Sequence, residues 1–118
     1  MSKIKGFIVV ALASLLPSVA TASERAQAAW DWIEQDAVVI DVRTVGEFQS
    51  GHLQGALNIP VGELDRADLS FLAKNQPVVV YCRSGNRSGS AEQILLSKGY
   101  VKVHNGGGLN ELMSVKSK

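Results

Sequence analysis

The sequence lacks the features that define several protein classes. It holds a single cysteine, so no disulfide can form within the chain, and its 3 prolines and 11 glycines are too few for a low-complexity chain. Its formal net charge is only +1. With no excess charge of either sign, the composition gives no reason to expect nucleic acid or an anionic membrane surface as a partner.

Long apolar runs are also absent. The main run covers residues 6–16 and stops at Pro17, whereas a membrane-spanning helix needs roughly 20 apolar residues. Two lysines precede this run and small residues follow it, which is the pattern of a secretory signal peptide. We therefore expect residues 1–22 to be a signal peptide that is cleaved after about Ala22. An uncleaved membrane anchor is the alternative.

Removal of this segment would leave residues 23–118, enough for one domain with one hydrophobic core. That part of the chain has ten basic and eleven acidic residues, a formal charge of −1. Its one cysteine, Cys82, is notable because exported proteins usually pair their cysteines or have none. The alternative for Cys82 is a buried, unreactive thiol.

Short apolar strands alternate with helices along residues 23–118. Strands are predicted where β-branched residues are contiguous, and helices where apolar residues recur every three or four positions between capping residues and glycines. This alternation predicts an α/β domain, a small parallel sheet flanked by helices on both faces. The predicted helices are 23–36, 44–49, 69–74, 88–98 and 109–115, the predicted strands are 38–40, 56–59, 78–81 and 101–104, residues 62–65 are a predicted turn, and glycines 106–108 are a predicted break.

The strongest strand signal, residues 78–81, leads directly into Cys82. Ligand sites in parallel α/β sheets lie beyond the carboxyl ends of the strands, and Cys82 is at such an end with a helix signal behind it. Gly85 permits a loop that curls with its N–H groups inward, and Arg83 and Arg87 add positive charge. Such an environment favours the thiolate, the reactive form of cysteine. Cys82 is therefore a candidate nucleophile, and a generic turn with two solvated arginines is the alternative.

Three segments of the chain resemble successive signatures of the rhodanese family, in the family's order and spacing. They are residues 40–43 with Glu47 and Phe48, residues 51–60, and residues 80–88, and the glycine-rich residues 105–109 follow them. A signal peptide on a single such domain is similar to the exported, single-domain members of the family. The resemblance implies a rhodanese-like domain over residues 23–118 in a periplasmic protein.

The resemblance further implies a sulfurtransferase whose nucleophile is Cys82. The thiolate would take the outer sulfur of thiosulfate or a similar donor, release sulfite and hold the sulfur as a persulfide. An acceptor such as cyanide or a thiol would then remove it. The loop that would bind the donor consists of Arg83, Ser84, Gly85, Asn86, Arg87 and Ser88. Some thiosulfate-specific relatives carry a lysine where this chain has Ser84. Affinity for thiosulfate would then depend on Arg83 and Arg87, or it would be modest because another compound is the physiological donor.

Two other functions compete with this one. Cysteine phosphatases and arsenate reductases have an arginine six residues after the cysteine, whereas here that position is Ser88 and the arginine comes one residue early, at Arg87. The loop is therefore short for a tetrahedral phosphate. The second alternative is a sulfur carrier or a binding module that catalyses nothing.

Asp41 and Arg43 lie two residues apart, so on a strand they would share a face. The resemblance gives them a supporting role at the site, and a structural ion pair with Glu47 is the alternative. His52 lies in a loop and is interpreted as architectural, and His104, at the end of a predicted strand, is a candidate general base.

No close pair of metal ligands such as Cys-x-x-Cys is present in the sequence, so neither a metal nor another cofactor is expected. Nothing in the sequence indicates an oligomer interface. We expect a monomer that has a small-molecule sulfur donor and acceptor as its partners and no stable membrane association after signal cleavage.

Overall fold

Four parallel strands form a single sheet in the order β2-β1-β3-β4. The computed structural model describes residues 22–116, and the expected signal segment lies outside them apart from its last residue. The strands are β1 (Val38–Asp41), β2 (Leu57–Asn58), β3 (Val78–Cys82) and β4 (Val103–Gly108). Each neighbouring pair is parallel. The predicted α/β fold with a small parallel sheet is confirmed.

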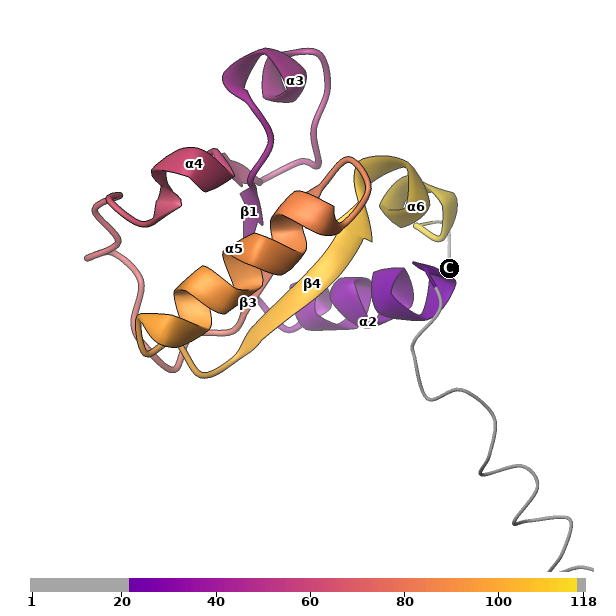
Figure 1. Cartoon of the computed structure of the whole chain (residues 1–118). Helices are drawn as coiled ribbons and strands as arrows, with labels where there is room; N and C mark the ends of the chain where they lie inside the picture. The colour runs from indigo at the N-terminus through magenta and orange to yellow at the C-terminus, as the bar shows by residue number, and fades with distance from the viewer. Residues whose placement is uncertain (1–21, 117–118) are drawn as a thin grey trace, which may run out of the picture.

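Helices cover both faces of the sheet, as expected (Figure 1). On one face lie α4 (Val61–Leu64) and α5 (Asn86–Ser97), and on the other lie α2 (Ala22–Glu34) and α6 (Leu109–Ser114). The remaining helix, α3 (Val45–Gln49), stands away from the sheet on an excursion between β1 and β2 (Figure 1). Among residues 22–116, no helix has the length and apolar character needed to cross a membrane.

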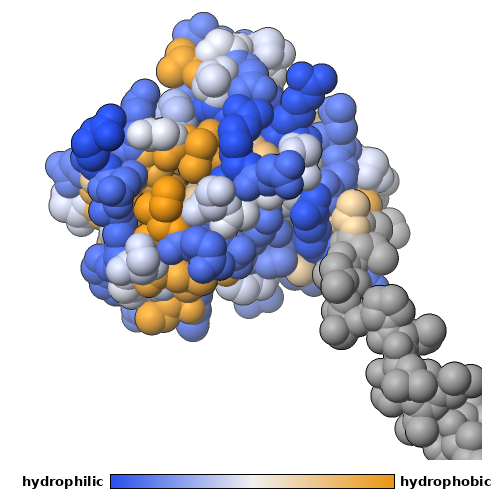
Figure 2. Space-filling model, in the orientation of Figure 1, coloured by the Kyte–Doolittle hydropathy of each residue, from blue (hydrophilic) through white to orange (hydrophobic). Residues whose placement is uncertain are grey.

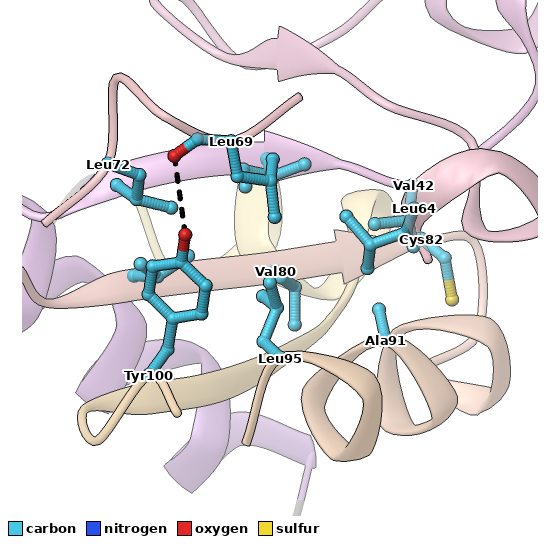
Figure 3. Packing of buried hydrophobic residues seen from close by; sticks show 11 residues of the cluster. Val42, Leu64, Leu69, Leu72, Val80, Cys82, Ala91, Leu95 and Tyr100 are labelled. Atoms are coloured by element: carbon cyan, nitrogen blue, oxygen red, sulfur yellow. Dashed lines mark hydrogen bonds between the residues drawn. The ribbon is translucent and has the colours of Figure 1, made fainter. Parts of the chain in front are cut away.

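Alternate side chains of β3 enter two separate apolar clusters, because successive residues of a strand point to opposite faces. Val78, Val80 and Cys82 pack on the α5 face. Figure 3 shows Val80 and Cys82 there beside Leu95. The intervening residues of β3 pack on the α2 face with alanines of that helix and with Leu112 of α6. All five residues of β3 are buried. The strand that carries Cys82 is thus packed against helices on both of its faces.

The structure corrects several local predictions. Strand β4 begins at Val103, two residues later than predicted, and α2 ends at Glu34, two residues earlier than predicted. Residues 69–74 form successive turns instead of a helix. The Leu69 carbonyl closes a single turn by accepting from the Leu72 N–H at 2.9 Å, and it also accepts from the Tyr100 hydroxyl at 3.3 Å. Residues 62–65, predicted as a turn, lie in and directly after α4. Glycines 106–108 do not break the chain but continue β4 through a shift of register. Helix α5 begins two residues earlier than predicted.

The surface on the face that carries α4 and α5 is mainly hydrophilic (Figure 2). Apolar surface gathers where α4 meets the middle of α5 (Figure 2). Leu96 of α5 and Phe71 are among the exposed large apolar residues of the described chain, at 41% and 57% exposure.

Candidate active site

Cys82 is the last residue of β3, and three residues separate it from the start of α5. Its side chain lies on the α5 face at the end of the apolar cluster, with the sulfur turned away from Val80 and Leu95 (Figure 3). The residue has no exposed surface. Burial alone would agree with an unreactive thiol, so the polar contacts of the sulfur decide between the two interpretations.

Several hydrogen-bond donors surround the Cys82 sulfur. The Gly85 N–H donates to Sγ at 3.0 Å and the Ser88 N–H donates to it at 3.4 Å, and the Ser88 hydroxyl lies 3.4 Å away. Ser88 is the third residue of α5, so the sulfur accepts the hydrogen bond that an N-cap side chain normally accepts. Gly85 itself has a φ of +98°, a conformation that favours glycine. The loop therefore aims its amides and the positive end of α5 at the thiol.

These donors change the acidity of the thiol. Burial acts to raise the pKa of Cys82, but the Ser88 hydroxyl and the N–H groups of Ser88, Gly85 and Ser84 together outweigh it, and the pKa is lowered from its ordinary value. A lowered pKa increases the thiolate fraction at neutral pH. Cys82 is thus buried, but the hydrogen bonds to its sulfur favour the thiolate.

The side-chain amide of Asn105 determines which hydrogen bonds the Ser88 hydroxyl can donate and accept. Its Nδ2 donates to the Gly85 carbonyl at 3.1 Å and its Oδ1 accepts from the Gly107 N–H at 2.9 Å, so the amide can have only one orientation. The Ser88 hydroxyl donates to the same Oδ1 at 2.7 Å. While it does so, it can only accept a hydrogen bond from the Cys82 thiol. Once the thiolate forms, the hydroxyl proton has two competing acceptors, the sulfur and Asn105.

The two loop arginines have different surroundings. Arg87 donates to both carboxylate oxygens of Glu47 in α3, at 2.7 and 3.0 Å. The Arg83 side chain is exposed, and no hydrogen bond or ion pair to another described residue holds it. A pocket of about 230 Å³ lies beside it, between α3 and the start of α6, and is lined by Arg43, Glu47, Ser50, Arg83, Leu109 and Asn110. Of the two cations, Arg83 is the one that is free to meet an anion.

Two further residues predicted for the site, Ser84 and Asn86, lie on the exposed side of the loop. Asn86 is also the first residue of α5. Gly108 packs against this loop so closely that a Cβ there would collide with the Arg83 carbonyl. The glycine-rich end of β4 therefore allows the loop to approach the sheet.

Asp41 and Arg43 are paired with each other, and Glu47 is paired with Arg87, so the alternative of an ion pair with Glu47 is wrong. The Asp41 carboxylate accepts four hydrogen bonds from Arg43, three from the guanidinium and one from the backbone N–H. Arg43 also donates to the Gly51 carbonyl at 2.7 Å. Asp41 is level with Tyr81 in the sheet, and Arg43 lies over the Tyr81 ring, on the face opposite to the Cys82 side chain. The pair braces the excursion that carries α3.

Neither histidine contacts Cys82. His52 stacks on the Phe48 ring with 3.6 Å between ring centroids, and its Nδ1 lies 2.8 Å from the Phe48 carbonyl oxygen. His104 Nε2 lies 2.8 Å from the Arg25 carbonyl oxygen, and its ring lies beside Trp32. Within the described part of the chain, no three His, Cys, Asp or Glu side chains are grouped so that they could share a metal ion.

Two residues of the site were not predicted from the sequence. Asn105 lies in the glycine-rich segment that contributed to the family resemblance, so its position was a signal, but its contact with Ser88 was not. Arg25 in α2 donates to the Ser84 carbonyl at 3.0 Å and pairs with Glu111 of α6. Nothing in the sequence distinguishes Arg25 from the other arginines.

Comparison with known proteins agrees with the resemblance found in the sequence. A family described as Rhodanese-like domain matches residues 25–113. The thiosulfate sulfurtransferase PspE of Escherichia coli (strain K12) is 44% identical over 80 residues, which cover 67% of this chain and 77% of that protein.

Solved structures show the same likeness. A structure of a rhodanese with anions from E. coli is 42% identical, with a TM-score of 0.60, over 64% of this chain and 89% of the other. The human single-domain sulfurtransferase TSTD1 is 28% identical, with a TM-score of 0.63, over 70% of this chain and 86% of the other. The residues that match the family include all four strands and the Cys82 loop.

Proposed function

This chain belongs to the rhodanese family, and from that premise we propose that it is a thiosulfate sulfurtransferase that carries one sulfur atom on Cys82. The observation that carries the proposal is the set of donors around the sulfur at the carboxyl end of β3. The N–H groups of Gly85 and Ser88 and the Ser88 hydroxyl all face Sγ. The similarity to PspE, whose name gives this activity, supports the same donor.

The proposed reaction has two displacement steps. The Cys82 thiolate attacks the outer sulfur of thiosulfate, the S–S bond of the donor breaks, and sulfite leaves with the electron pair of that bond. Cys82 is then a persulfide, and the loop amides and the helix dipole stabilise its terminal anion. Cyanide or a thiolate attacks this terminal sulfur, which gives thiocyanate or an acceptor persulfide and restores the Cys82 thiolate.

The donor is an anion, and we assign its sulfonate group to Arg83. This guanidinium is exposed beside the pocket, whereas Arg87 is bound to Glu47. Cys82 has no exposed surface and does not itself line this pocket, so side chains between the pocket and the loop must move before the donor reaches Sγ. Arg83 is well suited to this movement because no described contact restrains it.

A phosphatase is less compatible with this loop. Arg87, the arginine nearest to the position that a phosphate-binding loop needs, is directed to Glu47 of α3. Purified protein should be assayed with thiosulfate plus cyanide and, separately, with an aryl phosphate. We expect thiocyanate and ping-pong kinetics. Turnover of the aryl phosphate alone would overturn the proposal, and a protein that takes up sulfur but passes none to cyanide would be a carrier.

We also propose that the protein is exported to the periplasm and that residues 1–22 are removed. The support is the basic, apolar and small-residue order of this segment. The intact mass of protein isolated from a periplasmic extract should correspond to a chain that begins at about Ser23. A chain that still begins at Met1 would contradict cleavage.

A further inference from the structure

A single peptide unit links the Arg25 guanidinium to the Cys82 sulfur. Arg25 Nη2 donates to the Ser84 carbonyl oxygen at 3.0 Å, and the Gly85 N–H donates to Sγ at 3.0 Å. The Ser84 carbonyl and the Gly85 N–H belong to the same peptide bond. The described residues contain no cis peptide bond, so these two groups point in opposite directions. A hydrogen bond that fixes the carbonyl therefore also aims the N–H at the sulfur.

Arg25 is itself held in place from a third element. Its Nε donates to Glu111 Oε2 at 2.8 Å and its Nη2 donates to Glu111 Oε1 at 2.7 Å, a two-point contact between α2 and α6. The guanidinium lies against Gly85, where a Cβ would approach Nη2 to 2.7 Å. A two-point pair restricts the guanidinium plane more than a single contact would. The donor to the Ser84 carbonyl is therefore preorganised.

We propose that Arg25 is a positioning residue for sulfur transfer and that it acts through the Ser84–Gly85 peptide. The inference rests on the proposed function, because the sulfur that it serves is the Cys82 thiolate and its persulfide. A cation at the carbonyl end of a peptide also polarises it and strengthens its N–H as a donor. Arg25 touches neither donor nor acceptor in this scheme.

The charges around Cys82 are compatible with this role. Arg25 approaches from α2 and Arg87 from α5, and each is paired with a carboxylate, Glu111 and Glu47 respectively. The hydrogen bond to Glu111 raises the pKa of Arg25 against the effect of burial, and the charge of Cys82 raises it further. Arg25 therefore stays charged at any pH at which Cys82 titrates. Glu111 holds Arg25 but does not remove its hydrogen bond to the loop.

The test is the pKa of the Cys82 thiol, measured from the pH dependence of alkylation by iodoacetamide in folded protein. Arg25→Met should raise this pKa by about one unit, which makes alkylation below the pKa about tenfold slower. Its plateau rate at high pH should stay as in the wild type, whereas unfolding would expose the thiol. Arg66→Met, which removes an exposed arginine in the turn after α4, is the matched control and should leave the pKa unchanged. An unchanged pKa in Arg25→Met would overturn the inference.

Two further variants separate the effect of Arg25 on the orientation of the Ser84–Gly85 peptide from the effect of its charge. Arg25→Lys keeps the charge but replaces the planar guanidinium fork by one ammonium nitrogen, which does not fix the direction of the bond to the Ser84 carbonyl in the same way, so its thiol pKa should stay raised. Full restoration in Arg25→Lys would mean that charge alone acts, and would overturn the orienting role. Glu111→Gln, which leaves Arg25 in place, should raise the pKa by less than Arg25→Met does, and an unshifted pKa there would overturn the role of the two-point contact. A wild-type protein that takes up no sulfur would instead contradict the proposed function, whatever the variants show.

Discussion

Glu47 of α3 accepts hydrogen bonds from Arg87 of α5 through both carboxylate oxygens, at 2.7 and 3.0 Å. The same carboxylate closes the capping box at Thr44, where α3 begins. These contacts hold the pKa of Glu47 down at about 2, with the Arg87 hydrogen bond as the main cause. Glu47 is therefore ionised at neutral pH, and a sulfur donor that needs Arg87 must compete with it.

The first prediction concerns this competition. Glu47→Gln should lower the KM for thiosulfate by about threefold, because an ion pair of this exposure is worth no more than about 1 kcal/mol. Arg87→Ala should raise the KM more than it lowers kcat. Steady-state kinetics at saturating cyanide measure both, with Gln49→Ala on the exposed part of α3 as the control. Unchanged kinetics in Arg87→Ala would remove Arg87 from the site.

The second prediction concerns Arg83, the loop arginine with no partner in the described structure. Arg83→Ala should raise the KM for thiosulfate by about tenfold, the loss expected for a hydrogen bond to a charged group. The effect should exceed that of Arg87→Ala, since Arg87 must first leave Glu47. Thiosulfate titrations of the two variants and of Arg66→Ala decide the order. A larger effect in Arg87→Ala would reverse our assignment of the sulfonate group.

The third prediction concerns the Ser88 hydroxyl. Ser88→Ala removes one donor to the thiolate and should raise the Cys82 pKa by about one unit. Since the wild-type pKa is lowered, wild-type activity should persist at lower pH, and the acid limb of the variant's profile should move to higher pH. Sulfur loading measured as a function of pH gives both curves. Ser90→Ala, an exposed position on the same helix, should superimpose on the wild type, and a Ser88→Ala curve that does the same would contradict the role of the hydroxyl.

The fourth prediction is that Asp41 contributes to the stability of the fold and not to the reactivity of Cys82. Asp41→Asn breaks a buried ion pair and should lower the free energy of unfolding by about 3 kcal/mol. Because Asp41 lies on the face opposite to the Cys82 side chain, the thiol pKa of the folded variant should not change. Urea unfolding measures the first effect and alkylation the second. A stable variant with a shifted thiol pKa would place Asp41 in the site.

The features that could be predicted from the sequence are those that depend on neighbouring residues in the chain. Residues 78–81 are contiguous and apolar, and Gly85 follows three residues after Cys82, so strand, loop and nucleophile could be predicted together. The α/β fold followed from the alternation of such segments. Residues 69–74 have helical spacing but form turns, and the Leu69 carbonyl there accepts from the hydroxyl of Tyr100, a contact across 31 residues that no local pattern shows.

The contacts that tune the site were not predictable in this way. Arg25 reaches Ser84 across 59 residues of chain, and Glu47 reaches Arg87 across 40. Both pairs form only because the sheet order brings α2, α3 and the loop to the same end of the molecule. A single sequence has no local pattern that shows which arginine meets which carboxylate.

The most direct test of the whole account is the intact mass of the protein before and after treatment with thiosulfate. The wild type should gain the mass of one sulfur atom on Cys82 and lose it again when cyanide is added, with thiocyanate as the product. Cys82→Ser, checked by circular dichroism to be folded, should gain nothing. A folded wild type that gains no sulfur, or a Cys82→Ser variant that gains one, would contradict the persulfide on Cys82.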